Sequence, residues 1–242
     1  MFTETRSRGE SQLTMKKFTD QQTIDAWNKN AQAWITAVRQ GEIETRLLAT
    51  NQAIVDAILR RAPQTVLDVG CGEGWLIREL GGHGINALGI DIVPELIDSA
   101  VNAGVGRFRV LAYEEVSQKT LDEQFDVVVC NFSLLGKESV AHLFQHVPAL
   151  LNAGGAFIIQ TIHPVAGCDD LQYADGWRAG SWAGFSDNFT DPAPWYFRTM
   201  DSWKALFVAN GFTLRDIVEP VNPKTRLPAS VVFLGELAQL PD

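Results

Sequence analysis

A glycine-rich turn with an acidic residue before it is the segment whose residue types and spacing most clearly point to chemistry. Asp68 precedes three alternating glycines, Gly70, Gly72 and Gly74, in the stretch VLDVGCGEG. Glycine serves where a backbone turns sharply and where a ligand must approach it closely. An apolar run lies before the turn and a helical stretch lies after it. In an open α/β sheet such a turn stands at the carboxyl ends of the strands, so the stretch predicts a ligand site.

The glycine spacing distinguishes two classes of ligand. A dinucleotide site requires G-x-G-x-x-G, in which the third glycine lets the helix pack closely on the strand. The glycines here fall at positions 70, 72 and 74, and Trp75 occupies the place of that third small residue. The spacing therefore disfavours NAD and FAD, and an NAD-linked oxidoreductase remains as a rival function.

Short apolar runs alternate with helical stretches around this turn. The runs at 65–69, 87–91, 107–111, 126–131 and 156–162 predict strands, and the stretches at 74–80, 94–103, 113–121 and 137–151 predict helices. Continuous apolar runs are typical of strands buried on both faces of a parallel sheet. Asp91 ends the second run, where a carboxylate can accept hydrogen bonds from both ribose hydroxyls of a bound nucleoside. The order predicts an open α/β sheet with right-handed crossovers.

The pattern D-x-G-x-G-x-G resembles motif I of the class I methyltransferases that use S-adenosylmethionine (SAM). In that family the glycine turn passes the methionine part of SAM, and the resemblance implies that Asp68 lies near its amino group. It also implies that Asp91 binds the ribose and that Ile92 packs on the adenine. The matching segments cover residues 64–162 in the family's order. The cofactor contacts implied in this way are Asp68, Gly70, Cys71, Gly72, Gly74, Asp91, Ile92, Tyr113, Glu114 and Asn131.

One segment departs from the family pattern. Many members carry an aspartate in the loop after the third strand, where this chain has Ala112. The adenine amino group then needs another partner, and the alternatives are Glu114, the backbone or water.

The resemblance implies a doubly wound α/β fold with a mostly parallel, seven-stranded sheet. A helix at 200–210 and strands at 212–219 and 230–235 would complete it, with the last strand antiparallel. We expect a flexible tail at residues 1–18 and a single methyltransferase domain at 19–242. The expected parts of the domain are an N-terminal helical cap (19–63), a cofactor-binding core (64–162), a lid or substrate insertion (163–200) and a C-terminal helix with strands (201–242).

Two helices predicted before the core could help to close the cofactor site. Trp27, Ala31 and Trp34 resemble an aromatic-x3-Ala-x2-aromatic element of many small-molecule methyltransferases, in which the second aromatic residue covers the cofactor. Both tryptophans could instead be core residues of the first helix, for which Asp20 is the expected N-cap. Arg46 could pair with the cofactor carboxylate or form a surface salt bridge.

Candidate acceptor residues follow the core. His163 comes directly after the fifth strand and could take a proton from a hydroxyl or an amine during methyl transfer, or it could hold the loop by a structural hydrogen bond. Residues 173–197 are rich in glycine and aromatic residues. This composition favours a lid that covers an apolar or aromatic acceptor, and the alternative is that these residues form ordinary core. Trp177, Trp182 and Arg198 are the candidate substrate contacts, although Arg198 could equally be solvated.

Composition restricts the partners. The 242 residues carry a net charge of −9, which disfavours binding to a phosphate backbone. Cys71, Cys130 and Cys168 have no metal-ligand spacing and predict free thiols in a reducing compartment. No apolar run is long enough for a membrane span, and the polar N-terminus does not resemble a secretory signal. We therefore expect a cytoplasmic monomer or homodimer with no metal, nucleic acid or membrane partner.

The predicted function is SAM-dependent methyl transfer to a small-molecule acceptor of apolar or aromatic character. The alternatives are a non-catalytic SAM-binding protein, an enzyme that uses the same fold for other chemistry of the cofactor, and the NAD-linked oxidoreductase. The family is functionally mixed, so the resemblance indicates the cofactor and does not name the acceptor.

Overall fold

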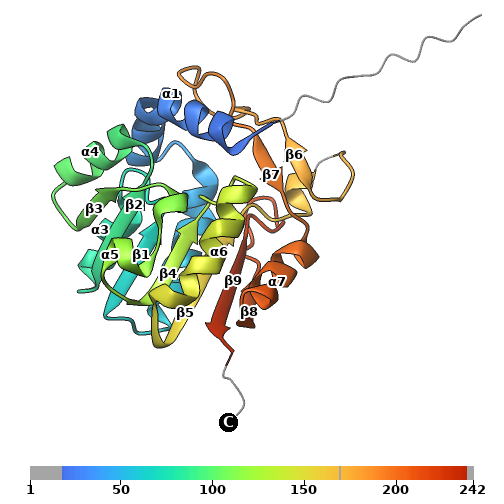
Figure 1. The fold of residues 1–242 in the computed structure, drawn as a ribbon. Coiled ribbons are helices and arrows are strands. Elements are labelled where there is room, and N and C mark those ends of the chain that lie inside the picture. The colour runs from blue at the N-terminus through green and yellow to red at the C-terminus, as the bar shows by residue number, and fades with distance from the viewer. Residues whose placement is uncertain (1–17, 169, 239–242) are drawn as a thin grey trace, which may run out of the picture.

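A seven-stranded sheet forms the centre of the molecule (Figure 1). The computed structural model describes residues 18–168 and 170–238, so the flexible tail expected at 1–18 lies outside the described residues except for Phe18. In sequence order the strands of this sheet are β1 (Thr65–Val69), β2 (Asn86–Asp91), β3 (Arg107–Val110), β4 (Phe125–Asn131), β5 (Leu151–Thr161), β8 (Phe212–Val218) and β9 (Val231–Leu237).

The spatial order of the strands is β3-β2-β1-β4-β5-β9-β8. The five strands from β3 to β5 are parallel to their neighbours, and β9 runs antiparallel to both β5 and β8. The predicted mostly parallel sheet with an antiparallel last strand is confirmed.

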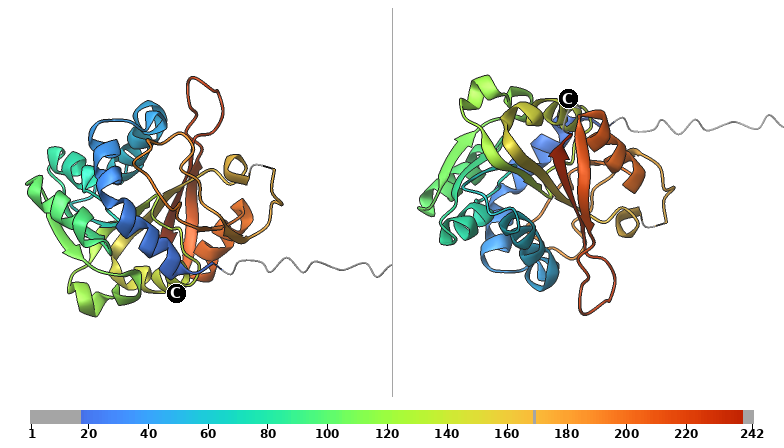
Figure 2. Two further views of the ribbon diagram at one scale, coloured as in Figure 1. Left: turned by 90° about the horizontal axis from the view of Figure 1, so that it is seen from above. Right: turned by 90° about the horizontal axis from the view of Figure 1, so that it is seen from below.

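Helices cover both faces of the sheet (Figures 1 and 2). They are α1 (Asp20–Arg39), α2 (Asn51–Leu59), α3 (Trp75–Gly82), α4 (Pro94–Asn102), α5 (Gln118–Leu121), α6 (Glu138–Leu150) and α7 (Met200–Ala209), with a π-helix η1 (Arg46–Thr50) and the 3₁₀ turns η2 (Tyr113–Glu115) and η3 (Ala166–Cys168). Helices α2 and α3 pack on one face, and α6 and α7 pack on the other. Across residues 18–168 and 170–238, no helix combines the length and the apolarity of a bilayer-crossing segment.

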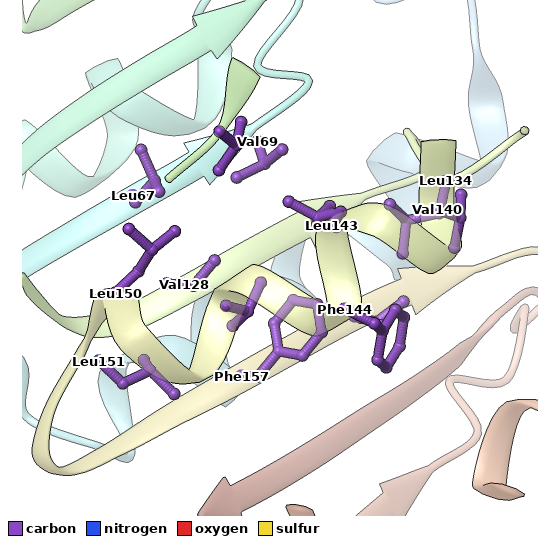
Figure 3. Packing of buried hydrophobic residues seen from close by; sticks show 14 of the residues in the cluster. Leu67, Val69, Val128, Leu134, Val140, Leu143, Phe144, Leu150, Leu151 and Phe157 are labelled. Atoms are coloured by element: carbon purple, nitrogen blue, oxygen red, sulfur yellow. The ribbon is translucent and has the colours of Figure 1, made fainter. Parts of the chain in front are cut away.

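Alternate residues of the central strands enter two separate cores. Val128 of β4 packs with Phe144 of α6 and Phe157 of β5 (Figure 3), whereas Val127 and Val129 pack on the opposite face. The rings of Phe144 and Phe157 meet edge to face, with centroids 5.0 Å apart. Burial on both faces explains why these strands have continuous apolar sequences. The two cores hold the carboxyl ends of β1, β2 and β4 beside one another.

Helix α1 packs above these carboxyl ends through a small third core. Ala31 and Ile35 on its buried face contact Val93 and Leu96 at the start of α4, and Trp27 and Trp34 pack against the same cluster. The tryptophans are therefore partly core residues, and both also face a cavity described below.

The N-terminus of α1 differs from the sequence expectation. Its N-cap is Thr19, whose hydroxyl accepts a hydrogen bond from the amide of Gln22 in a capping box. Asp20 instead accepts hydrogen bonds from the amides of Lys137 (2.9 Å) and Ser139 (2.7 Å), at the start of α6. The assignment of Asp20 as the cap of its own helix was therefore wrong, because the carboxylate satisfies the free amides of a different helix.

The segment from 163 to 200, which we call the insertion, contains a two-stranded ribbon. Strands β6 (Gly176–Arg178) and β7 (Trp195–Phe197) pair antiparallel, and the sequence patterns did not predict these two strands. Three-residue strands are too short to show a period of two. Arg178 is buried, lies 3.5 Å from the centre of the Phe197 ring and donates to backbone carbonyls of the preceding loop, which holds the ribbon in place.

The insertion is tied to α1 by buried polar contacts. The Thr23 hydroxyl donates to the carbonyl of Pro194 at 2.7 Å. The Asn30 side chain donates to the carbonyl of Thr190 at 2.7 Å and accepts from the amide of Thr190 at 2.8 Å. Figure 2 shows the two segments side by side over the edge of the sheet. Helix α1 and the insertion therefore cover that edge together.

Candidate functional site

A cavity of about 430 Å³ lies at the carboxyl ends of the parallel strands. Its walls come from the ends of these strands, from α1 and η1, and from the insertion. Ligand sites of small molecules have this size and this place in open α/β sheets. The predicted site residues that line it are Trp34, Arg46, Gly70, Cys71, Gly72, Asp91, Ile92, Tyr113, Glu114, Asn131 and Trp182.

Five predicted residues lie outside the lining. Asp68 and Gly74 lie on either side of the glycine turn. Asp68 is buried on β1, and Gly74 packs against Ala100 and Phe108. The other three are His163, Trp177 and Arg198, which are described below.

The glycine turn exposes its backbone to the cavity. Gly70 and Gly72 have φ angles of +77° and +57°, which residues with a side chain rarely adopt. A Cβ atom on Gly70 would lie 2.3 Å from the Cβ of Ser133, so this position is closed by protein. A Cβ atom on Gly72 would meet only the Trp34 indole, at 3.4 Å, across the cavity. Gly72 is thus the point where a ligand can approach the backbone.

Asp91 holds the turn in this shape. Its two carboxylate oxygens accept hydrogen bonds of 2.9 Å from the amides of Gly72 and Val93. Burial raises the pKa of this carboxyl, and the amide donors oppose that rise. Each oxygen keeps an acceptor site that is not used by these amides. Asp91 can therefore fix the turn and accept a ligand hydroxyl at the same time.

Opposite charges without full hydrogen bonding gather at one end of the cavity. Within the described part of the chain, Asp68 Oδ1, Arg46 Nη2, Asn131 Oδ1 and Thr50 Oγ1 are buried and have no hydrogen-bond partner. Such groups are costly in a folded protein and usually mark a missing partner. The arrangement suits a ligand that brings both an ammonium and a carboxylate group.

The electrostatics of this end follow from its burial. Burial, followed by repulsion from Asp91, raises the pKa of Asp68 to about 8, although the Arg46 charge opposes the rise. Burial lowers the pKa of Arg46 to about 10 against the attraction of Glu73 and Asp68. The Arg46 guanidinium stacks over Trp75 at 4.9 Å and donates to Asn51 Oδ1 at 3.1 Å. Among the described residues its Nη2 has no hydrogen-bond partner, so it can donate to a ligand carboxylate.

Glu73, inside the glycine motif, is a structural residue that the sequence analysis missed. Its side chain is 0% exposed and makes ion pairs with Arg78 (2.7 Å) and with Arg39 at the end of α1 (3.0 Å). The carboxylate therefore ties the glycine turn to the helix that covers it. A glutamate between glycines has the pattern of a solvated turn, so no local signal could have shown this.

Aromatic side chains form a continuous wall on the far side of the turn. Trp27 meets Trp34 edge to face at 5.1 Å and Trp182 at 5.8 Å, and Trp182 meets Phe185 at 5.3 Å. The Trp182 indole donates to the carbonyl of Thr190 at 3.0 Å, which fixes its orientation. This wall joins α1 to the insertion and offers flat apolar surface to a ligand.

Three residues that were predicted to act on or contact the methyl acceptor do not line the cavity. His163 is buried, and its Nε2 lies 2.9 Å from Glu219 Oε1. Trp177 packs on the Tyr196 ring at 5.7 Å. Arg198 is also buried; its guanidinium lies 4.8 Å from the centre of the Tyr196 ring and donates to the carbonyl of Lys137. The structure thus does not bring these three side chains to the cavity surface.

The described residues contain no cluster of three or more histidine, cysteine, aspartate or glutamate side chains that could hold a metal ion. Cys71, Cys130 and Cys168 are buried free thiols, and burial raises the pKa values of Cys71 and Cys130. A high thiol pKa disfavours the nucleophilic thiolate, which agrees with a packing role for Cys71.

Comparisons with known proteins indicate methyltransferases as relatives of this chain. A family model described as "Methyltransferase domain" matches residues 42–217. The ubiquinone biosynthesis O-methyltransferase of Xylella fastidiosa is 34% identical over 128 residues, 48% of this chain and 50% of that protein. The chain spans about half the length of such curated relatives.

Two solved structures show the same fold. An S-adenosylmethionine-dependent methyltransferase from Clostridium acetobutylicum has a TM-score of 0.64 at 15% identity, covering 88% of this chain and 99% of that one. The 1,6-didemethyltoxoflavin-N1-methyltransferase of Burkholderia thailandensis has a TM-score of 0.59 at 20% identity, covering 90% and 91%. The chain therefore belongs to the methyltransferase-domain family, and its fold is that of the class I S-adenosylmethionine-dependent methyltransferases.

Proposed function

We propose that this protein transfers a methyl group from SAM to a small-molecule acceptor. The observation that carries the proposal is the pair of buried, incompletely bonded charges, Asp68 and Arg46, beside the open backbone of Gly72. SAM has an amino-acid end with one ammonium and one carboxylate, and a nucleoside at the other end. Membership of the methyltransferase-domain family supports this choice of ligand over other zwitterions.

Each part of SAM has a counterpart among the residues that line the cavity or, for Asp68, lie buried two positions before the lining residue Gly70. Asp68 would hold the ammonium group and Arg46 the carboxylate, since Asp68 Oδ1 and Arg46 Nη2 have no hydrogen-bond partner among the described residues. Asp91 would accept from the ribose hydroxyls. Ile92, Tyr113 and Glu114 line the cavity on the nucleoside side in this assignment, and Asn131 lines it at the charged end.

SAM supplies an electrophilic methyl group on its sulfonium sulfur. The chain mainly has to bind SAM and the acceptor, align them and exclude water, because displacement of this methyl group needs little further activation. Helix α1 and the insertion cover the cavity and carry its aromatic wall, so we assign the lid role to both. A general-base role for His163 stays a prediction, and its pairing with Glu219 favours the structural alternative.

A methyl-transfer assay tests the proposed function. The full chain would be incubated with SAM and a panel of phenols and amines, and mass spectrometry would follow S-adenosylhomocysteine and methylated products. Formation of S-adenosylhomocysteine and methylated product in equal amounts would support methyltransferase activity. Tight SAM binding with no product over a broad panel would favour the non-catalytic alternative.

The remaining properties of the proposal concern partners and place. The net charge of −9 disfavours a nucleic acid acceptor, and we propose a monomer or homodimer. The three free thiols suit a reducing compartment, so we propose that the enzyme works in the cytoplasm.

A further inference from the structure

We propose that the methyl acceptor is an uncharged planar aromatic molecule and that Asp20 excludes anionic acceptors. This inference rests on the proposed function and adds the substrate class of the same site. It follows from three features of the cavity: its length along α1, the distribution of charge on its walls, and the occupied N-terminus of α6.

The cavity continues beyond the proposed cofactor end. Along α1 its lining runs from Trp34 through Trp27 and Thr23 to Asp20. Asp20 and Trp34 are fourteen positions apart, which is roughly 21 Å along a helix. Trp182 and Trp195 of the insertion line the same region. Flat aromatic side chains therefore form part of the wall at the far end, which suits a planar ligand.

The charges on the walls are distributed unequally. Arg46 is the one basic side chain in the lining formed by the described residues, and it belongs to the cofactor end. At the far end the charged lining residue is Asp20. Arg198 lies behind this wall, buried and stacked on aromatic rings, and does not line the cavity. An anionic acceptor would thus meet a carboxylate, and among the described residues no basic side chain lines this end of the cavity.

A backbone feature at this end that could bind an anion is already filled. Helix α6 begins beside the cavity, where Gly136 and Ser139 line the wall, and helix N-termini attract anions. Its first free amides, those of Lys137 and Ser139, donate to the two oxygens of Asp20 at 2.9 and 2.7 Å. The protein's own carboxylate therefore occupies the place that a carboxylate or phosphate of the acceptor would take.

Neutral polar groups remain for an acceptor hydroxyl or amine. Ser139 and Ser181 are among the residues that line the cavity, and Ser139 lies at the start of α6 beside Asp20. A serine hydroxyl both donates and accepts, so it can orient a phenol or an aromatic amine without a charge.

Titration calorimetry with matched probes tests the inference. The full chain, saturated with S-adenosylhomocysteine, would be titrated with 2-naphthol, 2-naphthoate and 2-naphthylmethylammonium, which share one planar ring system. We expect 2-naphthol to bind about tenfold or more tightly than 2-naphthoate, because the anion faces Asp20. Tighter binding of the anion or of the ammonium probe, or no binding of any probe, would overturn the proposed class.

Substitution of Asp20 identifies its part in this preference. Asp20→Asn and Asp20→Ser remove the charge and keep an acceptor for the α6 amides, and we expect the affinity ratio to fall to about threefold or less. Asp25→Asn is the matched control, since Asp25 lies on the exposed face of α1 and accepts from Gln21. An unchanged ratio in both Asp20 variants, with their folding confirmed by circular dichroism, would contradict the role of Asp20.

The first titration separates the two levels of the argument. Failure of the wild-type chain to bind S-adenosylhomocysteine would count against the proposed function itself. Binding of S-adenosylhomocysteine together with a reversed preference among the probes would count against the acceptor class alone.

Discussion

Replacing Asp68 by asparagine should stabilise the ligand-free protein at neutral pH and weaken its binding of SAM. Asp68 is buried, its Oδ1 has no partner among the described residues, and its pKa is raised to about 8, first by burial and then by Asp91. Asparagine has a similar size and does not ionise. The change therefore removes a carboxyl whose charged form the fold tolerates poorly and the proposed ligand needs.

The sign and size follow from proton linkage. The pKa of this carboxyl rises from 3.8 to about 8, so between these values the folded state holds a proton that the unfolded state releases. Stability therefore falls as pH rises through this window, by at most about 1.4 kcal/mol per pH unit. Solvent relaxation reduces that limit, and we expect Asp68→Asn to gain about 2–4 kcal/mol at pH 7, or roughly 5–15 °C in Tm.

Urea unfolding of both proteins between pH 4 and 8 measures the effect. The two should have similar stability near pH 4, where Asp68 is protonated in the folded state and only about half ionised in the unfolded state, and should diverge as pH rises. Asp126→Asn is a control of opposite sign. Although burial raises the pKa of Asp126, hydrogen bonds from Asn152 and from the backbone of Thr65 and Gln64 lower it overall. That variant should lose stability at neutral pH.

Two results would refute this reasoning. A stability difference between Asp68→Asn and wild type that does not grow with pH would show that the carboxyl is not desolvated as described. Calorimetry should give at least about tenfold weaker SAM binding for Asp68→Asn, because a charge-assisted hydrogen bond is lost. An unchanged affinity would remove Asp68 from the cofactor site.

Three further predictions test other parts of the site. Gly72→Ala should weaken SAM binding about tenfold or more, as measured by calorimetry. Gly84 also has a positive φ but lies in open space, so Gly84→Ala should lower stability by a similar amount and leave the affinity for SAM unchanged. Equal affinities of the two variants for SAM would contradict the role of the turn. Arg78→Met should lower the free energy of unfolding by about 3 kcal/mol in urea, because Glu73 is fully buried and would keep one partner; a loss below about 1 kcal/mol would count against this network. His163→Gln should keep kcat within about threefold, since the ring lies outside the cavity lining; a hundredfold loss of kcat at constant KM would assign the base role to it.

Features that depend on neighbouring residues could be predicted from the sequence. The bounds of β1 match the prediction at residues 65–69, and Asp91 ends β2 as expected. Both lie in continuous apolar runs, and such runs report burial directly. The glycine turn follows the same logic, because its conformations exclude most side chains. The order of these segments was enough to indicate the sheet and the strand ends that line the cavity.

Features that depend on distant residues could not be predicted. Asp20 caps α6 across 117 positions of sequence, and Asn30 binds Thr190 across 160. Glu73 is buried only because Arg39 and Arg78 reach it. None of these pairs produces a periodic or local pattern in the sequence. The sequence around each residue is typical of a solvated polar side chain, and only the fold brings its partner close.

The most direct test of the central claim is calorimetric titration of the purified full chain, freed of carried-over ligand, with SAM and separately with NADH. The glycine turn, Asp68, Arg46 and Asp91 predict saturable binding of SAM with one site per chain and no saturable binding of NADH. Binding of NADH, or the absence of SAM binding by folded protein, would contradict the assignment of this cavity as a SAM site.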